Sequence, residues 1–232
     1  MKITIDGIGS DGKPTHNEWT GKYDGKDYLR EEYWSALFGL GTRFGVSALD
    51  RDEARRLVVE PVKSKLTFSP ESVEWAISAT ACQPFLLQCL CNRIFDFAAQ
   101  TKTRSITLDV VIEAGAVLVK DNEHFASLWG YAGSYRRRLI LMLCAQRKGA
   151  TEQVTFGELQ ELLTQRGIEI TDEKLDADLS YLRELELIDL VGTSGDIHYQ
   201  LAIPLMAAWM ETHQDFDAIL RQAQAEVEEE NA

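Results

Sequence analysis

The sequence predicts a mainly α-helical fold: a small helical bundle, then a winged-helix domain, with a short β-like segment before both. Apolar residues recur at helical spacing from about Tyr33 onward, and capping residues or prolines separate the periodic stretches. Two short β-type runs follow three predicted helices near residue 188, which is the order of a winged helix. With 232 residues, the chain can form two small cores. The expected parts are a β-like or loose segment, a helical bundle, a winged-helix domain and an acidic helical tail, at residues 1–35, 36–125, 126–212 and 213–232.

Turn-forming pairs characterise the first 28 residues. Asp6-Gly7, Asp11-Gly12 and Asp24-Gly25 separate short alternating runs such as residues 2–5. Such pairs favour hairpins over helices. We therefore expect β structure or loose chain in this segment.

Four helices are predicted between residues 50 and 119, and each starts at a side chain that can cap a helix or at a proline. The first has two acids in its first turn and stops before Pro61. Four short helices in this span describe a small bundle. They are residues 51–59 capped by Asp50, a helix that starts at Ser69-Pro70, residues 85–99 after Pro84, and residues 108–119 capped by Thr107.

Three further helices and a hairpin predict the winged helix, after a connection over residues 121–134. The first carries an apolar face, the second opens with a capping box and ends at Gly167, and the third carries four leucines. One more helix can start at Pro204, and the acidic end at 226–230 is expected to fray. The predicted elements are a helix from Tyr135, a helix from Thr155, a helix capped by Thr171, and a hairpin over 188–191 and 197–201.

The charge distribution favours a protein or intramolecular contact over DNA. The formal net charge of -13 repels nucleic acid unless a local basic face exists. The predicted recognition helix, residues 172–186, holds six acids against Lys174 and Arg183, and the wing turn has no cation. Residues 135–212 contain eight Lys and Arg against thirteen Asp and Glu, the opposite of a DNA-binding footprint.

One basic cluster stands out in this region. Arg136, Arg137 and Arg138 could contact a phosphate or an acidic partner segment such as the tail. The more common alternative is a solvated helix face.

The cysteines favour core packing over a metal site. Cys82, Cys89, Cys91 and Cys144 lie in or beside apolar stretches. Three of them crowd one predicted helix, where a disulfide framework is disfavoured, and their spacing lacks the close pairs of tetrahedral zinc sites. No export signal precedes Ser10, and no apolar run is long enough to span a membrane. We expect a cytoplasmic protein without membrane contact and without a bound metal.

No catalytic residue is predicted, because no serine, cysteine or carboxylate stands in a recognisable nucleophile or dyad context. His16 and Glu18 could form an acid–base pair, but their spacing alone carries almost no weight. Three tryptophans at helical packing positions are expected to be buried anchors, with base stacking as the minor alternative. They are Trp75, Trp129 and Trp209.

Two stretches, Leu49–Val62 and Ala81–Cys91, resemble the helical lid of AAA+-like STAND ATPases, and His124–Trp129 resembles the lead-in to the winged helix of that family. The resemblance covers residues 43–212. In that family the nucleotide lies between a P-loop core and the lid, and a glycine-rich turn before a proline packs near the base. The resemblance thus places Gln83 and Pro84 near a nucleotide, although residues 81–83 are Ala, Cys and Gln where glycine and histidine are common.

The P-loop core of that family is missing from this sequence. No G-x-x-x-x-G-K-[ST] motif occurs, and the strand-plus-acid segment that holds magnesium is absent. Arg43–Val46 resembles a remnant of the last strand of that core, and Thr15–Tyr28 is similar to a piece of a small uncharacterised bacterial β-rich domain.

The resemblance implies a regulatory or interaction module without hydrolytic activity of its own. No cofactor is expected, and ATP or ADP would bind only if another chain supplied the P-loop core. A protein partner or an intramolecular contact is favoured. The alternatives are a winged-helix DNA-binding transcription regulator and a folded relic of a larger protein.

Overall fold

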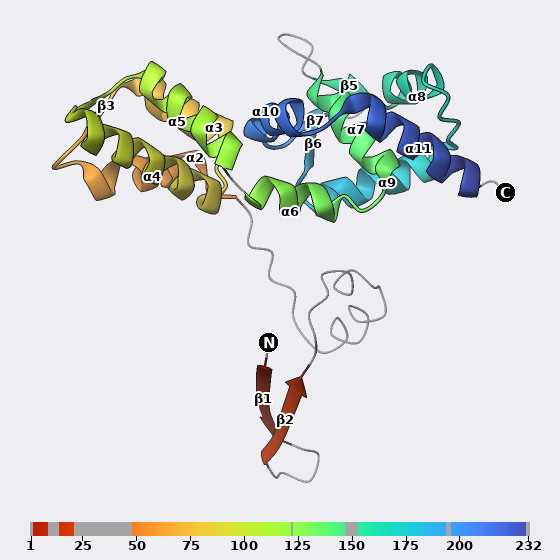
Figure 1. Ribbon diagram of the computed structural model, residues 1–232, viewed down its shortest axis with the longest axis horizontal. Coiled ribbons are helices and arrows are strands. Elements are labelled where there is room, and N and C mark those ends of the chain that lie inside the picture. Colours follow the sequence, from red (N-terminus) through yellow and green to blue (C-terminus); the bar gives the residue numbers. More distant parts are fainter. Residues whose placement is uncertain are drawn as a thin grey trace. The chain divides into compact units, whose positions relative to one another are not determined.

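The computed structural model describes residues 2–8, 14–20, 48–121, 123–146, 153–193 and 196–230. The chain divides into two compact units, Met1–Val46 and Ser47–Ala232. Helices dominate the described part of the second unit (Figure 1), so the mainly helical fold that the sequence predicts is confirmed.

A β-hairpin is the described part of the first unit. Strand β1 (Lys2–Ile8) pairs antiparallel with β2 (Pro14–Thr20), and Ile5 lies opposite Asn17. Of the two expected forms, β-like or loose, the described residues have the first, but Asp6 and Gly7 pair within β1 and do not form the predicted turn. The Asp11-Gly12 and Asp24-Gly25 turns and the proposed strand remnant at 43–46 lie outside the described residues.

The second unit begins with a group of helices whose first residues agree with the helix starts predicted from the sequence. The Asp50 side chain accepts a hydrogen bond from the Glu53 N–H at 2.8 Å, and Ser69 caps the next helix, whose first residue is Pro70. Two short strands, β3 (Thr67–Phe68) before α3 and β4 (Ser105–Ile106) before α5, pair in parallel and so connect the segments that lead into these two helices. Its helices are α2 (Arg51–Val59), the 3-10 turn η2 (Glu60–Val62), α3 (Pro70–Ala79), α4 (Pro84–Thr101) and α5 (Leu108–Asp121).

Residues 121–134 are not a plain connection, and that prediction is wrong. Helix α6 (Glu123–Tyr131) occupies most of this span and buries Phe125 and Trp129. These two large side chains contribute enough apolar surface to hold a short helix against the core.

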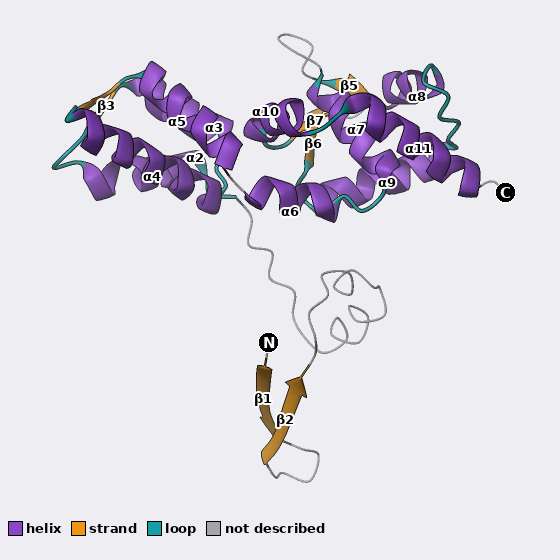
Figure 2. Ribbon diagram, viewed as in Figure 1, coloured by secondary structure: helices purple, strands orange, loops and turns teal. Residues whose placement is uncertain are grey.

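A second group of helices surrounds a three-stranded antiparallel sheet (Figure 2). The strand order is β5-β7-β6, so that the short strand before α8 pairs with the second strand of the hairpin. The capping box at Thr155 and the left-handed Gly167 after α8 are both present, as predicted. The elements are α7 (Tyr135–Ala145), β5 (Val154–Thr155), α8 (Phe156–Thr164), α9 (Asp172–Glu184), β6 (Ile188–Thr193) and β7 (Asp196–Leu201).

Two helices close this group, α10 (Pro204–His213) and α11 (Phe216–Glu230). The acidic tail does not fray over its described length, so that expectation is wrong. Ile219, Ala223 and Val227 recur every fourth residue and bury one stripe of α11, which lies along α7 (Figure 1).

Helix α10 also connects the two groups, because it packs on α3 and α5. Gly115 of α5 leaves room for the Trp75 ring, and Leu205 of α10 reaches the same place. Trp129 and Trp209 are buried with ring centroids 6.1 Å apart, and Trp75 is half-buried against the core. The prediction of buried anchors is confirmed for Trp129 and Trp209, whereas Trp75 packs against the core but is only partly buried.

Candidate functional site

The turn between α3 and α4 has an uncommon backbone conformation. The Cys82 N–H donates to the Ile77 carbonyl at 3.0 Å, and the Ala81 N–H donates to the Ser78 carbonyl at 3.2 Å, which is the Schellman pattern of a helix end. Ala81 has φ 50° and Cys82 has φ 56°. A left-handed conformation costs a residue with a Cβ about 1–2 kcal/mol, so two in succession mark a turn that its surroundings hold in place.

Hydrogen bonds to neighbouring backbone fix this turn. The Cys82 carbonyl accepts from the Leu49 N–H at 3.1 Å, and the Gln83 N–H donates to the Thr80 carbonyl at 3.0 Å. Gln83 is then the extended N-cap of α4, and Pro84 is its first residue. The two residues that the resemblance placed near a nucleotide therefore form the start of α4.

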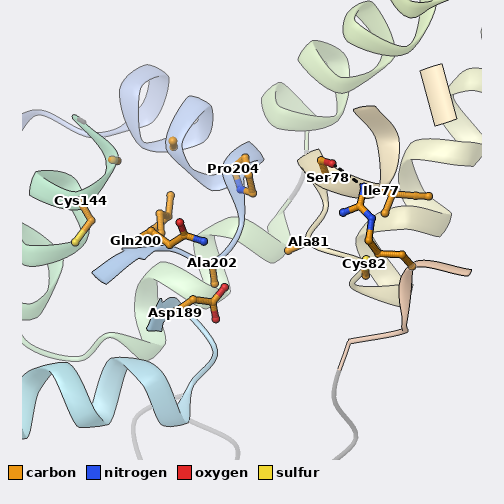
Figure 3. A pocket seen from close by; sticks show the side chains of 13 residues that line it. Ile77, Ser78, Ala81, Cys82, Cys144, Asp189, Gln200, Ala202 and Pro204 are labelled. Carbon is orange, nitrogen blue, oxygen red and sulfur yellow. Dashed lines mark hydrogen bonds between the residues drawn. The ribbon is translucent and has the colours of Figure 1, made fainter. Parts of the chain in front are cut away.

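A pocket of about 570 Å³ lies beside the turn, between the two groups of helices. Ser78, Ala81 and Cys82 form one wall, and Asp189, Gln200 and Ala202 face them from the sheet and the loop before α10 (Figure 3). Gln83 and Pro84 follow the turn directly but are not among the residues that line the pocket. The volume falls within the range of small-molecule sites, roughly 300–1,000 Å³.

Polar groups of both signs line this pocket. The Arg51 guanidinium donates to Glu74 at 2.5 Å and to Ser78 Oγ at 3.4 Å, and Glu74 also pairs with Arg55. Asp189 lies on the opposite wall, where desolvation raises the pKa of its carboxyl group. A ligand with both donor and acceptor groups suits this lining better than a purely apolar one.

The pocket favours binding over covalent chemistry. Cys82 and Cys144 both line it, and the Cys82 thiol has a pKa raised above the usual value, chiefly by burial, with Arg51 acting in the opposite direction. A raised pKa reduces the thiolate that a nucleophilic cysteine needs.

The basic cluster of α7 lies elsewhere, in a buried network. Arg136 is 7% exposed; its Nε donates to Asp178 Oδ2 at 2.6 Å, and its Nη1 donates to both Glu230 oxygens at 3.0 and 2.8 Å. Lys174 pairs with the same Glu230 at 3.1 Å. The solvated-face interpretation is wrong for Arg136, and the contact with the tail that the sequence suggested is present.

The other two arginines also make contacts within the fold. Arg137 Nε donates to Asp178 Oδ1 at 2.7 Å, and its guanidinium carbon lies 3.9 Å from the Tyr181 ring centroid. Arg138 Nε donates to the Trp129 carbonyl at 3.3 Å. All three arginine side chains are thus engaged with neighbouring residues.

Glu226 completes the attachment of α11. Its Oε2 accepts from the backbone N–H of Tyr135 at 2.6 Å and of Arg136 at 3.3 Å, while Ser134 caps the same helix through Arg137 N–H. A distant acid therefore satisfies donors of the first turn of α7 and stabilises its positive end.

Sequence reasoning missed Asp178 as a structural group, because it was counted among the acids of a recognition helix. Its position directly before Leu179 and three residues after Leu175 puts it on the buried stripe of α9, and that placement is a readable signal. The pocket lining had no comparable signal, because its residues come from six helices and strands and the turns between them.

The remaining candidates lie at several places in the chain. Cys89 and Cys91 pack half-buried against the core. Cys144, by contrast, is buried and lines the pocket from α7. His16 and Glu18 lie on β2 opposite Asp6 and Thr4. Within the described ranges, no group of His, Cys, Asp or Glu has a metal-binding arrangement, and no described helix is both long and apolar enough to cross a bilayer.

No family model matches the sequence, and no curated protein matches it at a significant level.

Proposed function

We propose that the chain is a regulatory, protein-contacting module that resembles the lid and winged helix of STAND-type ATPases and hydrolyses no nucleotide on its own. The observation that carries this proposal is the left-handed turn at Ala81 and Cys82, directly before Gln83-Pro84 and against a pocket between two groups of helices. A ligand or partner group in that pocket would contact both groups and so link its binding to their arrangement.

The order of elements supports a lid followed by a winged helix. The first group is a small bundle of helices, and the second has helix, short strand, two helices and a hairpin on which the short strand pairs. The left-handed backbone at Ala81 and Cys82 is the conformation that glycine adopts most easily. These residues stand where the family that the sequence resembles commonly has glycine or histidine, and their glycine-like backbone supports the resemblance.

The exposed face of α9 supports a protein contact over DNA. In a winged helix this element would enter the major groove, and basic side chains would contact phosphates. Here the exposed acids outnumber the cations, and the arginines of α7 are committed to internal partners. The exposed acids of α9 are Asp172, Glu173, Asp176 and Glu184.

Titration calorimetry of the full chain with ATP and ADP, with and without magnesium, together with a phosphate-release assay, tests the proposal. We expect no phosphate release. If nucleotide binds, Arg51→Gln should weaken it, because this cation lines the pocket, whereas Arg56→Gln on the outer side of the same helix should not.

Phosphate release that scales with protein concentration and disappears in Arg51→Gln would overturn the proposal, because the chain would then contain an active site. Tight, salt-sensitive binding to duplex DNA that needs α9 would favour a DNA-binding regulator instead.

A further inference from the structure

A local basic surface exists on this acidic chain, at the end of the helical bundle marked by β3 in Figure 1. Lys65 precedes β3, and Lys102 and Arg104 precede β4; the two segments adjoin because the Thr67 N–H donates to the Arg104 carbonyl at 2.8 Å. All three cations are exposed, and none forms an ion pair with a described residue. The neighbouring Lys63 differs, because it pairs with Glu60 at 2.7 Å.

An exposed aromatic ring lies among these cations. Phe95 of α4 is 40% exposed, and Lys65 Nζ lies 5.9 Å from its ring centroid. An exposed aromatic side chain does not contribute the burial of apolar surface that stabilises a fold. Where such a side chain adjoins further apolar surface, the patch is typical of a contact surface.

Two hollows flank Phe95. On one side is an apolar groove of about 420 Å³ between α2, η2 and α4, lined by side chains such as Leu57, Val62 and Phe68. On the other side is a basic hollow of about 450 Å³ that contains Lys65, Lys102 and Arg104. Leu66 and Phe95 line both, so the hollows form one continuous surface, the Phe95 surface.

This surface is separate from the pocket beside the turn. Phe95 lies eleven residues after Pro84 on the same helix, which is about 16 Å along its axis at 1.5 Å per residue.

We propose that the Phe95 surface binds an acidic peptide segment of a partner protein. An apolar side chain of the peptide would fill the groove, and its carboxylates would face the three cations. The charge complementarity supports this choice. The chain has a net charge of -13, but these three cations form no ion pair with a described residue, so an anionic segment would compensate the repulsion among them.

The lining favours a peptide over a nucleic acid. A phosphate backbone has no apolar group to place among Leu57, Val62 and Phe68, and a long polyanion would meet the negative charge of the rest of the chain. An amphipathic peptide with an apolar anchor beside acids satisfies both hollows.

Selection from a phage-displayed library of random peptides of about 12 residues tests the proposal with the full chain as bait. We expect enrichment of peptides in which a large aliphatic or aromatic residue adjoins two or more acids. A fluorescein-labelled peptide of the selected sequence should bind less tightly as salt rises, because screening weakens its contacts with the cations.

Two matched pairs of variants locate the binding. Phe95→Ser and Lys102→Glu should each raise the Kd at least about tenfold. Phe85→Ser, at another exposed phenylalanine of α4, and Lys120→Glu on α5 should leave the Kd within about twofold. Circular dichroism checks that all four variants are folded.

Selected peptides without acids, or a Kd equally affected in both members of a pair, would overturn the proposal. Tighter binding of an oligothymidylate of about 20 nucleotides, lost in Lys102→Glu, would overturn it in favour of nucleic acid. These outcomes do not depend on nucleotide titration, so this proposal and the proposed function can fail separately.

Discussion

Arg136 and Asp178 form an ion pair in the interior of the protein, with Arg136 Nε 2.6 Å from Asp178 Oδ2 and only 8% and 2% of the two side chains exposed. Burial of two charges is costly unless each has good partners. Asp178 also receives Arg137, and Arg136 also reaches Glu230, so both charges are neutralised by more than one partner.

Replacement of Asp178 by Asn should lower the free energy of unfolding by about 3–5 kcal/mol, because Arg136 would remain buried without its main counter-charge. Urea denaturation measures this change. Asp176→Asn, the same substitution at an exposed position of α9, should change stability by less than about 0.5 kcal/mol. An equal effect of both substitutions would contradict the role given to the pair.

Acid pH should weaken the contacts that hold α11 on the rest of the second unit. The pKa of Glu230 lies below its usual value of 4.5: partial burial raises it, but hydrogen bonds and charges of Lys174 and Arg136 lower it further. A lowered folded-state pKa gives stability that is present above 4.5 and is lost as pH falls through the folded-state value. Urea midpoints should therefore fall more steeply below about pH 5 in the wild type than in Glu230→Gln.

Glu228→Gln is the matched control on the same helix, because Glu228 is exposed and makes no ion pair with a described residue. It should keep the wild-type pH dependence. Identical profiles for all three proteins would show that the Glu230 contacts do not form in solution.

Relief of backbone strain at the turn before Pro84 should stabilise the protein. Ala81 has φ 50°, so Ala81→Gly should raise the free energy of unfolding by about 0.5–1 kcal/mol. Ala177→Gly, at an exposed position within α9, should lower it by about 1 kcal/mol. A loss at both positions would indicate that residue 81 is not left-handed.

A methyl group on Gly115 should disturb the contact between α3, α5 and α10. A Cβ there would lie 2.6 Å from Trp75 Cη2. Gly115→Ala should thus destabilise by about 1–2 kcal/mol in spite of its better helix propensity, with an altered tryptophan fluorescence spectrum. Gly130→Ala in α6 meets nothing within 4 Å and should instead stabilise by up to about 1 kcal/mol.

Cys91 should react slowly with alkylating agents. Burial raises the pKa of its thiol from 9.0 to about 11, so at pH 8 its thiolate population is about 100-fold below that of an unperturbed cysteine. Timed iodoacetamide labelling with mass spectrometry should show this lag in the native chain and its loss in urea. Labelling of Cys91 at the same rate in both conditions would contradict its burial.

Local signals in the sequence were sufficient for most element boundaries. Asp50, Ser69, Thr155 and Thr171 each cap a helix within three residues of themselves, so their effect is independent of the rest of the fold. The hairpin at 188–201 was readable for the same reason.

Long-range partners were harder to predict. The acidic end of α11 was expected to fray. Its narrow apolar stripe instead packs on α7, about 90 residues earlier in the chain, and its acids bind backbone and arginine donors of that helix. Helix α6 was missed because its burial depends on α10, which contributes Trp209. The pocket beside Ala81 is likewise assembled from distant elements.

The contact between α7 and α11 also sets an order of events during synthesis. Arg136 and Glu230 are 94 residues apart, so at roughly 5–20 residues per second the ribosome takes about 5–20 s to supply the second after the first. During that interval, α11 does not yet cover the apolar face of α7. The N–H groups of Tyr135 and Arg136, which later donate to Glu226, are also open to water or to other chains. A nascent chain halted within this window should therefore be a better client for chaperones than one released after Glu230.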